Sequence, residues 1–180
     1  MLVPLEVFKD NPYKTLISTL LSSRTRDEVT LEASKRLFRV APNLKALRKI
    51  DEKTIEKLIY PVGFSKTKAK YLKMLSGLID GVPKTREGLM KLPGVGRKTA
   101  NLVLNRAFHI PAIAVDTHVH RISNLLGWVK TKSPEKTEVS LIKILPKIYW
   151  PDINRLFVSI GRQFRSIKKL KEFLKANLLI

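Results

Sequence analysis

The chain has 180 residues, which is enough for one domain of ordinary size or two small helical lobes sharing a core, and too few for a large modular enzyme. Its 35 Lys and Arg residues outnumber its 15 Asp and Glu residues and give a formal charge of +20 at pH 7. This surplus makes nucleic acid the first partner to consider, although a lysine-rich surface can also serve solubility alone.

Apolar residues recur at three- and four-residue steps through most of the chain, a spacing that predicts amphipathic helices. The first helix is marked by Tyr13, Leu16, Ile17, Leu20 and Leu21. Further helices are predicted at about 26–39, 43–48, 52–60, 65–79, 85–91, 96–108, 117–126, 134–146, 151–163 and 166–177. Short breakers with proline or glycine separate them, and strand alternation is hard to find. We therefore predict an all-α fold.

The apolar run 110–115 is the best candidate for a seam between two helical lobes. No uninterrupted apolar stretch reaches the roughly eighteen residues that would span a bilayer. The first twelve residues also lack the basic segment and long apolar core of a secretory signal. We therefore expect a cytoplasmic protein with no membrane association.

The string LPGVGRKTAN at 92–101 predicts a tight hairpin between two helices. Pro93 ends the first helix, Gly94 and Gly96 permit a sharp turn, and a new helix begins near Gly96. Backbone amides at a helix start attract anions, so a phosphodiester can approach the two glycines closely. The alternative is a plain connection between helices, which a single Gly-x-Gly would favour.

The strings LPGVGRKTANLVLN and IPAIAVDTHVHR resemble the helix-hairpin-helix DNA glycosylases, most closely the endonuclease III branch. The resemblance extends from Asn11 to Leu126 and includes LLSSRTRD at 20–27 and VGFSKTKA at 62–69. It implies a monomeric base excision repair enzyme that removes damaged bases from double-stranded DNA in the cytoplasm, at the nucleoid. It also implies a DNA-binding cleft between two helical lobes.

The lobes are expected at 5–112 and 113–180. The first contains six helices and the helix-hairpin-helix motif at about 86–108. The second is expected to be joined by residues 1–4.

Lys98 falls in the first turn of its predicted helix, beside Arg97. The helix dipole and the neighbouring cation both disfavour a second positive charge there. A neutral amine can attack the sugar carbon that carries a damaged base and form a Schiff base. For most lysines in this chain a solvated surface charge is the better interpretation, but Lys98 matches the family's nucleophile position. The resemblance implies a bifunctional glycosylase and abasic-site lyase, since members with only glycosylase activity have another residue there.

Asp116 ends an apolar run and precedes Thr117, so the local pattern predicts a helix N-cap. A carboxylate held there can stabilise positive charge at the anomeric carbon or assist proton transfer. In the resemblance it is the catalytic aspartate. The eighteen residues from Lys98 to Asp116 are enough to bring the two side chains together.

Candidate DNA contacts lie in the hairpin and on two loops. The hairpin supplies Gly94, Val95, Gly96, Arg97 and Thr99. The resemblance places residues that fill the gap left by a flipped base at Arg24 and Phe64, where Phe64 is an apolar wedge or a core aromatic. Arg24 departs from the glutamine common near that position, and a phosphate clamp or a surface charge are its alternatives.

We expect no cofactor. The chain has no cysteine, which excludes the [4Fe–4S] cluster that many endonuclease III relatives carry. His118 and His120 diverge on their predicted helix and join no acidic cluster, so no metal site is expected, although the resemblance allows a monovalent ion at the hairpin carbonyls. A final helix docked by Leu170, Phe173, Leu174 and Leu178 is expected to replace the cluster's structural role.

The resemblance to the endonuclease III branch implies oxidised pyrimidines such as thymine glycol as the expected substrates. The alternatives are oxidised guanine or mismatched uracil and thymine on the same scaffold. A non-catalytic helix-hairpin-helix DNA-binding protein would also explain the charge and the glycines, but it would have no use for Lys98 and Asp116 together.

Overall fold

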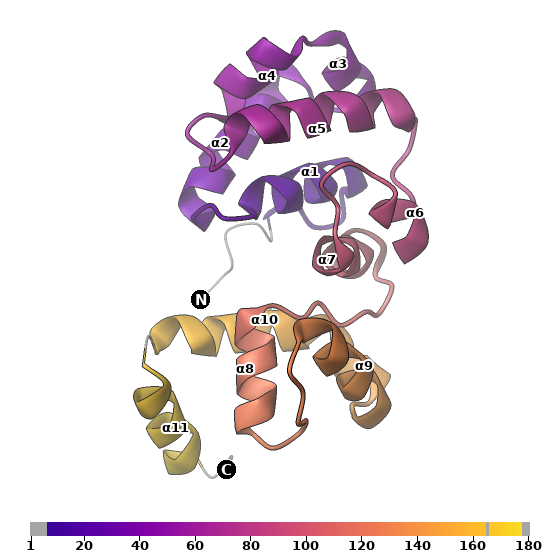
Figure 1. Ribbon diagram of the computed structural model, residues 1–180. Helices are drawn as coiled ribbons and strands as arrows, with labels where there is room; N and C mark the ends of the chain where they lie inside the picture. Colours follow the sequence, from indigo (N-terminus) through magenta and orange to yellow (C-terminus); the bar gives the residue numbers. More distant parts are fainter. Residues whose placement is uncertain (1–6, 165, 178–180) are drawn as a thin grey trace. The chain divides into compact units, whose positions relative to one another are not determined.

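The computed structural model describes residues 7–164 and 166–177, and its regular elements are helices, which confirms the predicted all-α fold (Figure 1). In chain order they are α1 (Pro12–Ser22), α2 (Asp27–Val40), α3 (Leu44–Lys49), α4 (Glu52–Ile59), α5 (Ser65–Leu78), α6 (Arg86–Met90), α7 (Arg97–Phe108), α8 (Thr117–Leu125), α9 (Pro134–Ile144), the short 3-10 helix η2 (Lys147–Tyr149), α10 (Trp150–Gln163) and α11 (Ile167–Ala176). None of the helices in these ranges is both long and apolar enough to cross a membrane.

The chain divides into two compact units, one ending at Ile110 and the other beginning at Pro111. Helices α1 to α7 form the first unit, and α8 to α11 with η2 belong to the second. The proposed lobes 5–112 and 113–180 stay a prediction, and the residues 1–4 expected to join the second lobe lie outside the described residues.

The first unit is built around α1, which packs against α2 and α7. The five residues that marked this helix in the sequence, from Tyr13 to Leu21, are all buried. Its polar residues are buried as well: the Thr15 hydroxyl donates to the Phe8 carbonyl at 2.7 Å, and the Ser18 hydroxyl lies 3.3 Å from the Thr15 carbonyl. Because these hydroxyls have acceptors inside the unit, α1 is buried on nearly every side at little polar cost.

The second unit has its own apolar core, to which α8, α9, α10 and α11 all contribute. The predicted docking of the last helix is confirmed, since Leu170 and Leu174 are fully buried. The Phe173 ring lies against that of Phe164, with centroids 4.8 Å apart. Leu178, also expected to dock, lies outside the described residues. The core residues are Ile113, Val115, Val119, Ile122, Val129, Leu141, Ile153, Phe157, Leu170 and Leu174.

Candidate active site and nucleic-acid interface

The hairpin between α6 and α7 is a short turn fixed by its apolar residues. Leu92 and Val95 are buried, and the Val95 amide donates to the Leu92 carbonyl at 3.1 Å. Val95 was predicted to contact DNA. In the structure its amide closes the turn and its side chain is buried. Gly94 and Gly96, which flank it, are exposed.

The two hairpin glycines are required for different reasons. Gly94 has a φ of +75°, and a Cβ added there would lie 2.5 Å from the Tyr71 ring on α5. Gly94 therefore serves the fold, because a side chain there would be strained and would collide with the Tyr71 ring. Gly96 has an ordinary extended backbone, with nothing within 4 Å of an added Cβ. The space beside Gly96 is open to an approaching ligand.

Lys98 lies in the first turn of α7 and is exposed. The helix begins at Gly96, which has no side chain to cap it, and the Gly96 carbonyl accepts from the Ala100 amide at 2.9 Å. Arg97 and Thr99 flank Lys98 and are half-buried. A helix start whose N-cap residue has no side chain keeps room for a phosphate, which its partial positive charge attracts.

Asp116 is the N-cap of α8, as its local sequence predicted. Its Oδ1 atom accepts from the His118 and Val119 amides, each at 2.9 Å, and the residue is half-buried. The segment before it is anchored too, because the Asn154 side chain on α10 donates to the Ala114 carbonyl at 2.9 Å. The carboxylate therefore has a fixed position at the edge of the second unit's core. Lys98 belongs to the first unit and Asp116 to the second.

The two histidines after Asp116 diverge, as predicted, and they contact different helices. The His118 ring lies against Gly161 of α10, where an added Cβ would collide with Nδ1. His120 Nδ1 is 2.6 Å from the Thr137 hydroxyl on α9. Within residues 7–164 and 166–177, no three His, Asp or Glu side chains are grouped closely enough to hold a metal ion.

Arg24 and Phe64 are brought together, although forty residues separate them. The Arg24 guanidinium lies 5.5 Å from the centroid of the Phe64 ring. Phe64 is 61% exposed, which contradicts the alternative that it is a core aromatic. Both residues have left-handed backbones, with φ of +52° and +58°.

Sequence reasoning missed Lys68, which is buried on α5 and hydrogen-bonded beneath these two residues. The sequence did contain a sign that Lys68 is buried. Lys68 precedes the buried Leu72 and Leu75 by four and seven residues, which places it on the same face of the helix.

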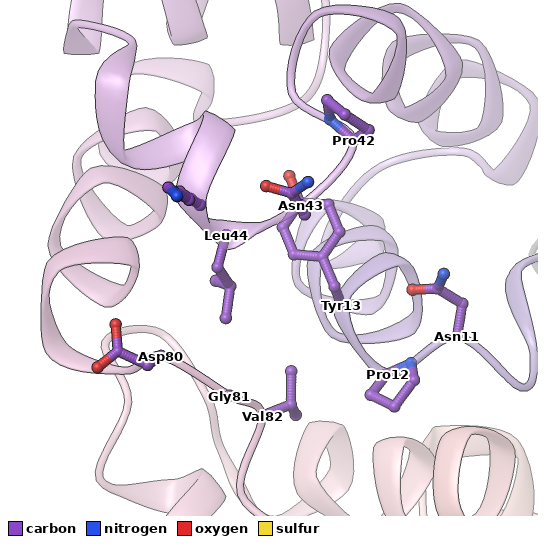
Figure 2. A pocket seen from close by; sticks show the side chains of 10 residues that line it. Asn11, Pro12, Tyr13, Pro42, Asn43, Leu44, Asp80, Gly81 and Val82 are labelled. Atoms are coloured by element: carbon purple, nitrogen blue, oxygen red, sulfur yellow. The ribbon is translucent and has the colours of Figure 1, made fainter.

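A hollow elsewhere in the first unit contains none of the predicted site residues (Figure 2). The Tyr13 hydroxyl at its wall donates to the Ala41 carbonyl at 2.8 Å, and the Asp80 carboxylate accepts from Arg48 at 2.7 Å. These two polar groups are thus engaged within the protein. It is lined by Asn11, Pro12, Tyr13, Pro42, Asn43, Leu44, Lys45, Asp80, Gly81 and Val82.

Comparison with known proteins places the chain in a family. Residues 17–147 match the profile of the HhH-GPD superfamily of base excision DNA repair proteins. The chain is 49% identical over 158 residues to endonuclease III of Thermotoga maritima. The matched region covers 85% of this chain and 74% of that protein. It is 44% identical over 159 residues to endonuclease III-like protein 1 of Gallus gallus, covering 84% of this chain and 57% of that longer protein.

Two solved structures with DNA are similar in fold. One is a trapped covalent intermediate of endonuclease III and DNA, with a TM-score of 0.81, 36% identity, and coverage of 87% of this chain and 76% of that one. The other is a non-covalent endonuclease III–DNA complex, with a TM-score of 0.83, 36% identity, and coverage of 90% and 78%. The chain therefore belongs to the helix-hairpin-helix superfamily of base excision DNA repair proteins, as a DNA glycosylase and abasic-site lyase of the endonuclease III branch.

Proposed function

We propose that the chain removes damaged pyrimidines, such as thymine glycol, from duplex DNA and nicks the strand through an imine on Lys98. The observation that carries this proposal is the exposed Lys98 in the first turn of α7, beside the open space at Gly96. A similar protein, 36% identical, has been trapped as a covalent intermediate with DNA, which supports a covalent route. The charge of +20 supplies the attraction to duplex DNA.

In the proposed reaction, a damaged nucleotide flips out of the duplex and Lys98 Nζ attacks its C1′ atom. The bond from C1′ to the base breaks, and its electron pair leaves with the base, which takes up a proton. Opening of the sugar ring gives an imine between Nζ and C1′. Loss of a C2′ proton then expels the 3′ phosphate, and water releases the enzyme from the cut strand.

We assign Asp116 an electrostatic role and a proton-transfer role in the same reaction. Its Oδ1 atom is fixed by two amides of α8, so little reorganisation is needed when positive charge develops on the sugar. The lone pairs of the carboxylate are acceptors for the proton that Lys98 must lose. This assignment requires the Asp116 carboxylate to reach the sugar of the nucleotide that Lys98 attacks.

The hairpin is proposed to bind a DNA phosphate through Gly94, Gly96 and the first turn of α7. Two smaller expectations accompany it: a monovalent cation held by hairpin carbonyl oxygens, and residence at the nucleoid in the cytoplasm. Comparing affinity for duplex DNA in potassium and in lithium buffers at equal ionic strength tests the cation. Equal affinities in both would contradict it.

A substrate panel tests the proposed specificity. Duplexes carrying thymine glycol, 8-oxoguanine, or uracil or thymine opposite guanine are incubated with the protein, and free base and strand nicks are measured separately. We expect base release and nicking from the thymine glycol duplex. Release only from the guanine lesion or the mismatches would move the specificity to those substrates, and binding without release from any duplex would favour a non-catalytic DNA-binding protein.

A further inference from the structure

Lys68 lies near the start of α5 with its side chain buried, at 6% exposure. Its ammonium donates to the Leu21 carbonyl at 2.8 Å, to the Ser23 carbonyl at 2.5 Å and to the Thr25 hydroxyl at 3.3 Å. An ammonium has three donors, so each has an acceptor here. A cation is stable inside a protein only with such a complete set of partners. These bonds therefore fix the backbone between α1 and α2.

The segment that Lys68 holds carries Arg24. Arg24 has a φ of +52°, which is uncommon for a residue other than glycine. The Thr25 amide donates to the Ser22 carbonyl at 3.1 Å and closes the turn. Such a conformation persists when its surroundings determine it from several sides. The Lys68 contacts on either side of Arg24, at Ser23 and Thr25, provide that determination.

The same segment touches the loop that carries Phe64. The Gly63 amide donates to the Thr25 hydroxyl at 3.1 Å. A Cβ added at Gly63 would lie 2.6 Å from the Arg24 carbonyl oxygen, so the two backbones are in direct contact. The Thr25 hydroxyl thus bridges Lys68 and the Phe64 loop. Through it, one buried cation connects the two exposed side chains.

We infer that Lys68 is a positioning residue that holds Arg24 and Phe64 together in the arrangement that enters the duplex beside a flipped nucleotide. The inference rests on the proposed function, because it presumes recognition of a damaged base. Entering a duplex requires unstacking, and a loop that must also be ordered at that moment binds more weakly. A wedge held in place before DNA arrives avoids the second cost. Lys68 itself is buried and contacts no DNA in this account.

The test replaces Lys68 by methionine, which removes the three donors while keeping a chain of similar length. Lys66→Met is the matched control: it lies two residues away on α5, is exposed, and loses the same charge. Affinity is measured for an undamaged duplex and for one carrying a tetrahydrofuran abasic-site analogue. Fluorescence of 2-aminopurine next to the analogue reports unstacking.

We expect Lys68→Met to weaken binding to the analogue duplex by about tenfold or more, with reduced 2-aminopurine fluorescence. Lys66→Met should weaken binding to both duplexes equally, because phosphate contacts do not distinguish damaged from undamaged DNA. Lys68→Met should weaken binding to the undamaged duplex no more than Lys66→Met does. If Lys68→Met preserved the preference for the analogue duplex, the inference would be overturned.

Thr25→Val provides a second route in case Lys68→Met does not fold. It removes the bridging hydroxyl while keeping the side-chain volume. Combined with Phe64→Ala, which removes the wedge, it should cause no additional loss of preference for the analogue duplex. Equal losses in the presence and absence of Phe64 would show that the loops act independently, which overturns the inference.

These outcomes are distinguishable from failure of the proposed function. If the unaltered chain neither prefers the analogue duplex nor releases any damaged base, the proposed function fails and the inference falls with it. If the unaltered chain does both, and Lys68→Met and Thr25→Val keep the full preference, only the inference fails.

Discussion

The helices that carry the two proposed catalytic residues, α7 and α8, begin in opposite ways. Helix α7 begins at Gly96, which provides no side-chain cap, with open space beside it. Helix α8 begins at Asp116, whose carboxylate caps the His118 and Val119 amides at 2.9 Å. A start with glycine as the N-cap leaves room for an external anion, whereas the start of α8 is capped by the carboxylate of Asp116.

This difference shows how one structural element serves two tasks in the same reaction. At α7 the positive helix end is proposed to bind DNA phosphate, and it places Lys98 beside the strand. At α8 the helix start orients a carboxylate that is proposed to act on the sugar. Substitutions of Gly96 or Asp116 should therefore change the free energy of unfolding and the activity on DNA by different amounts.

The largest effect is expected from Lys98→Gln. Because the amide cannot form an imine, nicking of an abasic duplex should fall by at least about a thousandfold. Binding to the same duplex, measured by fluorescence anisotropy, should survive. Undiminished nicking by Lys98→Gln would assign the nucleophile to another residue.

Asp116 offers a pair of changes that separate its two roles. Asp116→Asn keeps the cap, because asparagine caps helices as well as aspartate does, but it should slow base removal by about a hundredfold. Asp116→Ala should slow the reaction similarly and also lower the free energy of unfolding by about 1 kcal/mol. Single-turnover base release and denaturant unfolding measure the two effects. Equal unfolding free energies for the two variants would contradict the capping role.

Gly96→Asp would make α7 begin as α8 does. Its backbone, with φ −91° and ψ 178°, suits an N-cap, and the space for a side chain is open. Stability should stay equal or rise by up to about 1 kcal/mol, while affinity for duplex DNA falls about tenfold, since the carboxylate occupies the helix start and repels phosphate. Gly96→Asn is the neutral control. An unchanged affinity in Gly96→Asp would show that phosphate does not bind at this helix start.

The last effect is on stability alone and concerns Lys68, which is buried, whereas Lys98 is exposed. Burial lowers the pKa of Lys68 from 10.5 to about 8. Between these values the unfolded chain binds more protons than the folded chain, so the cost of burying the charge disappears as pH rises. The unfolding free energy of the unaltered chain, relative to Lys68→Met, should increase from about pH 8 to 10.5. A difference that stays flat across this range would contradict a titrating buried amine.

Local patterns were sufficient for much of the fold and part of the site. The spacing of Leu16, Ile17 and Leu21 predicted the buried side of α1, and the run before Asp116 predicted its cap, because both depend on residues within one or two turns.

The arrangement around Phe64 could not be predicted in this way. The Arg24–Phe64 contact joins residues forty positions apart, and Lys68 beside them bonds to carbonyls 45 and 47 residues earlier in the chain. The periodic spacing of apolar residues does not predict a contact between residues so far apart in the chain. The different surroundings of the two hairpin glycines could not be predicted either. Tyr71 would collide with a side chain at Gly94, whereas nothing lies within 4 Å of a Cβ added at Gly96.

Borohydride trapping tests most directly whether Lys98 forms an imine with DNA. A labelled duplex carrying thymine glycol or an abasic site is incubated with the unaltered chain or with Lys98→Gln, and borohydride is added to reduce any imine to a stable bond. We expect a covalent band with both duplexes that disappears in Lys98→Gln. A band that persists in Lys98→Gln, or tight binding with no band from the unaltered chain, would contradict it.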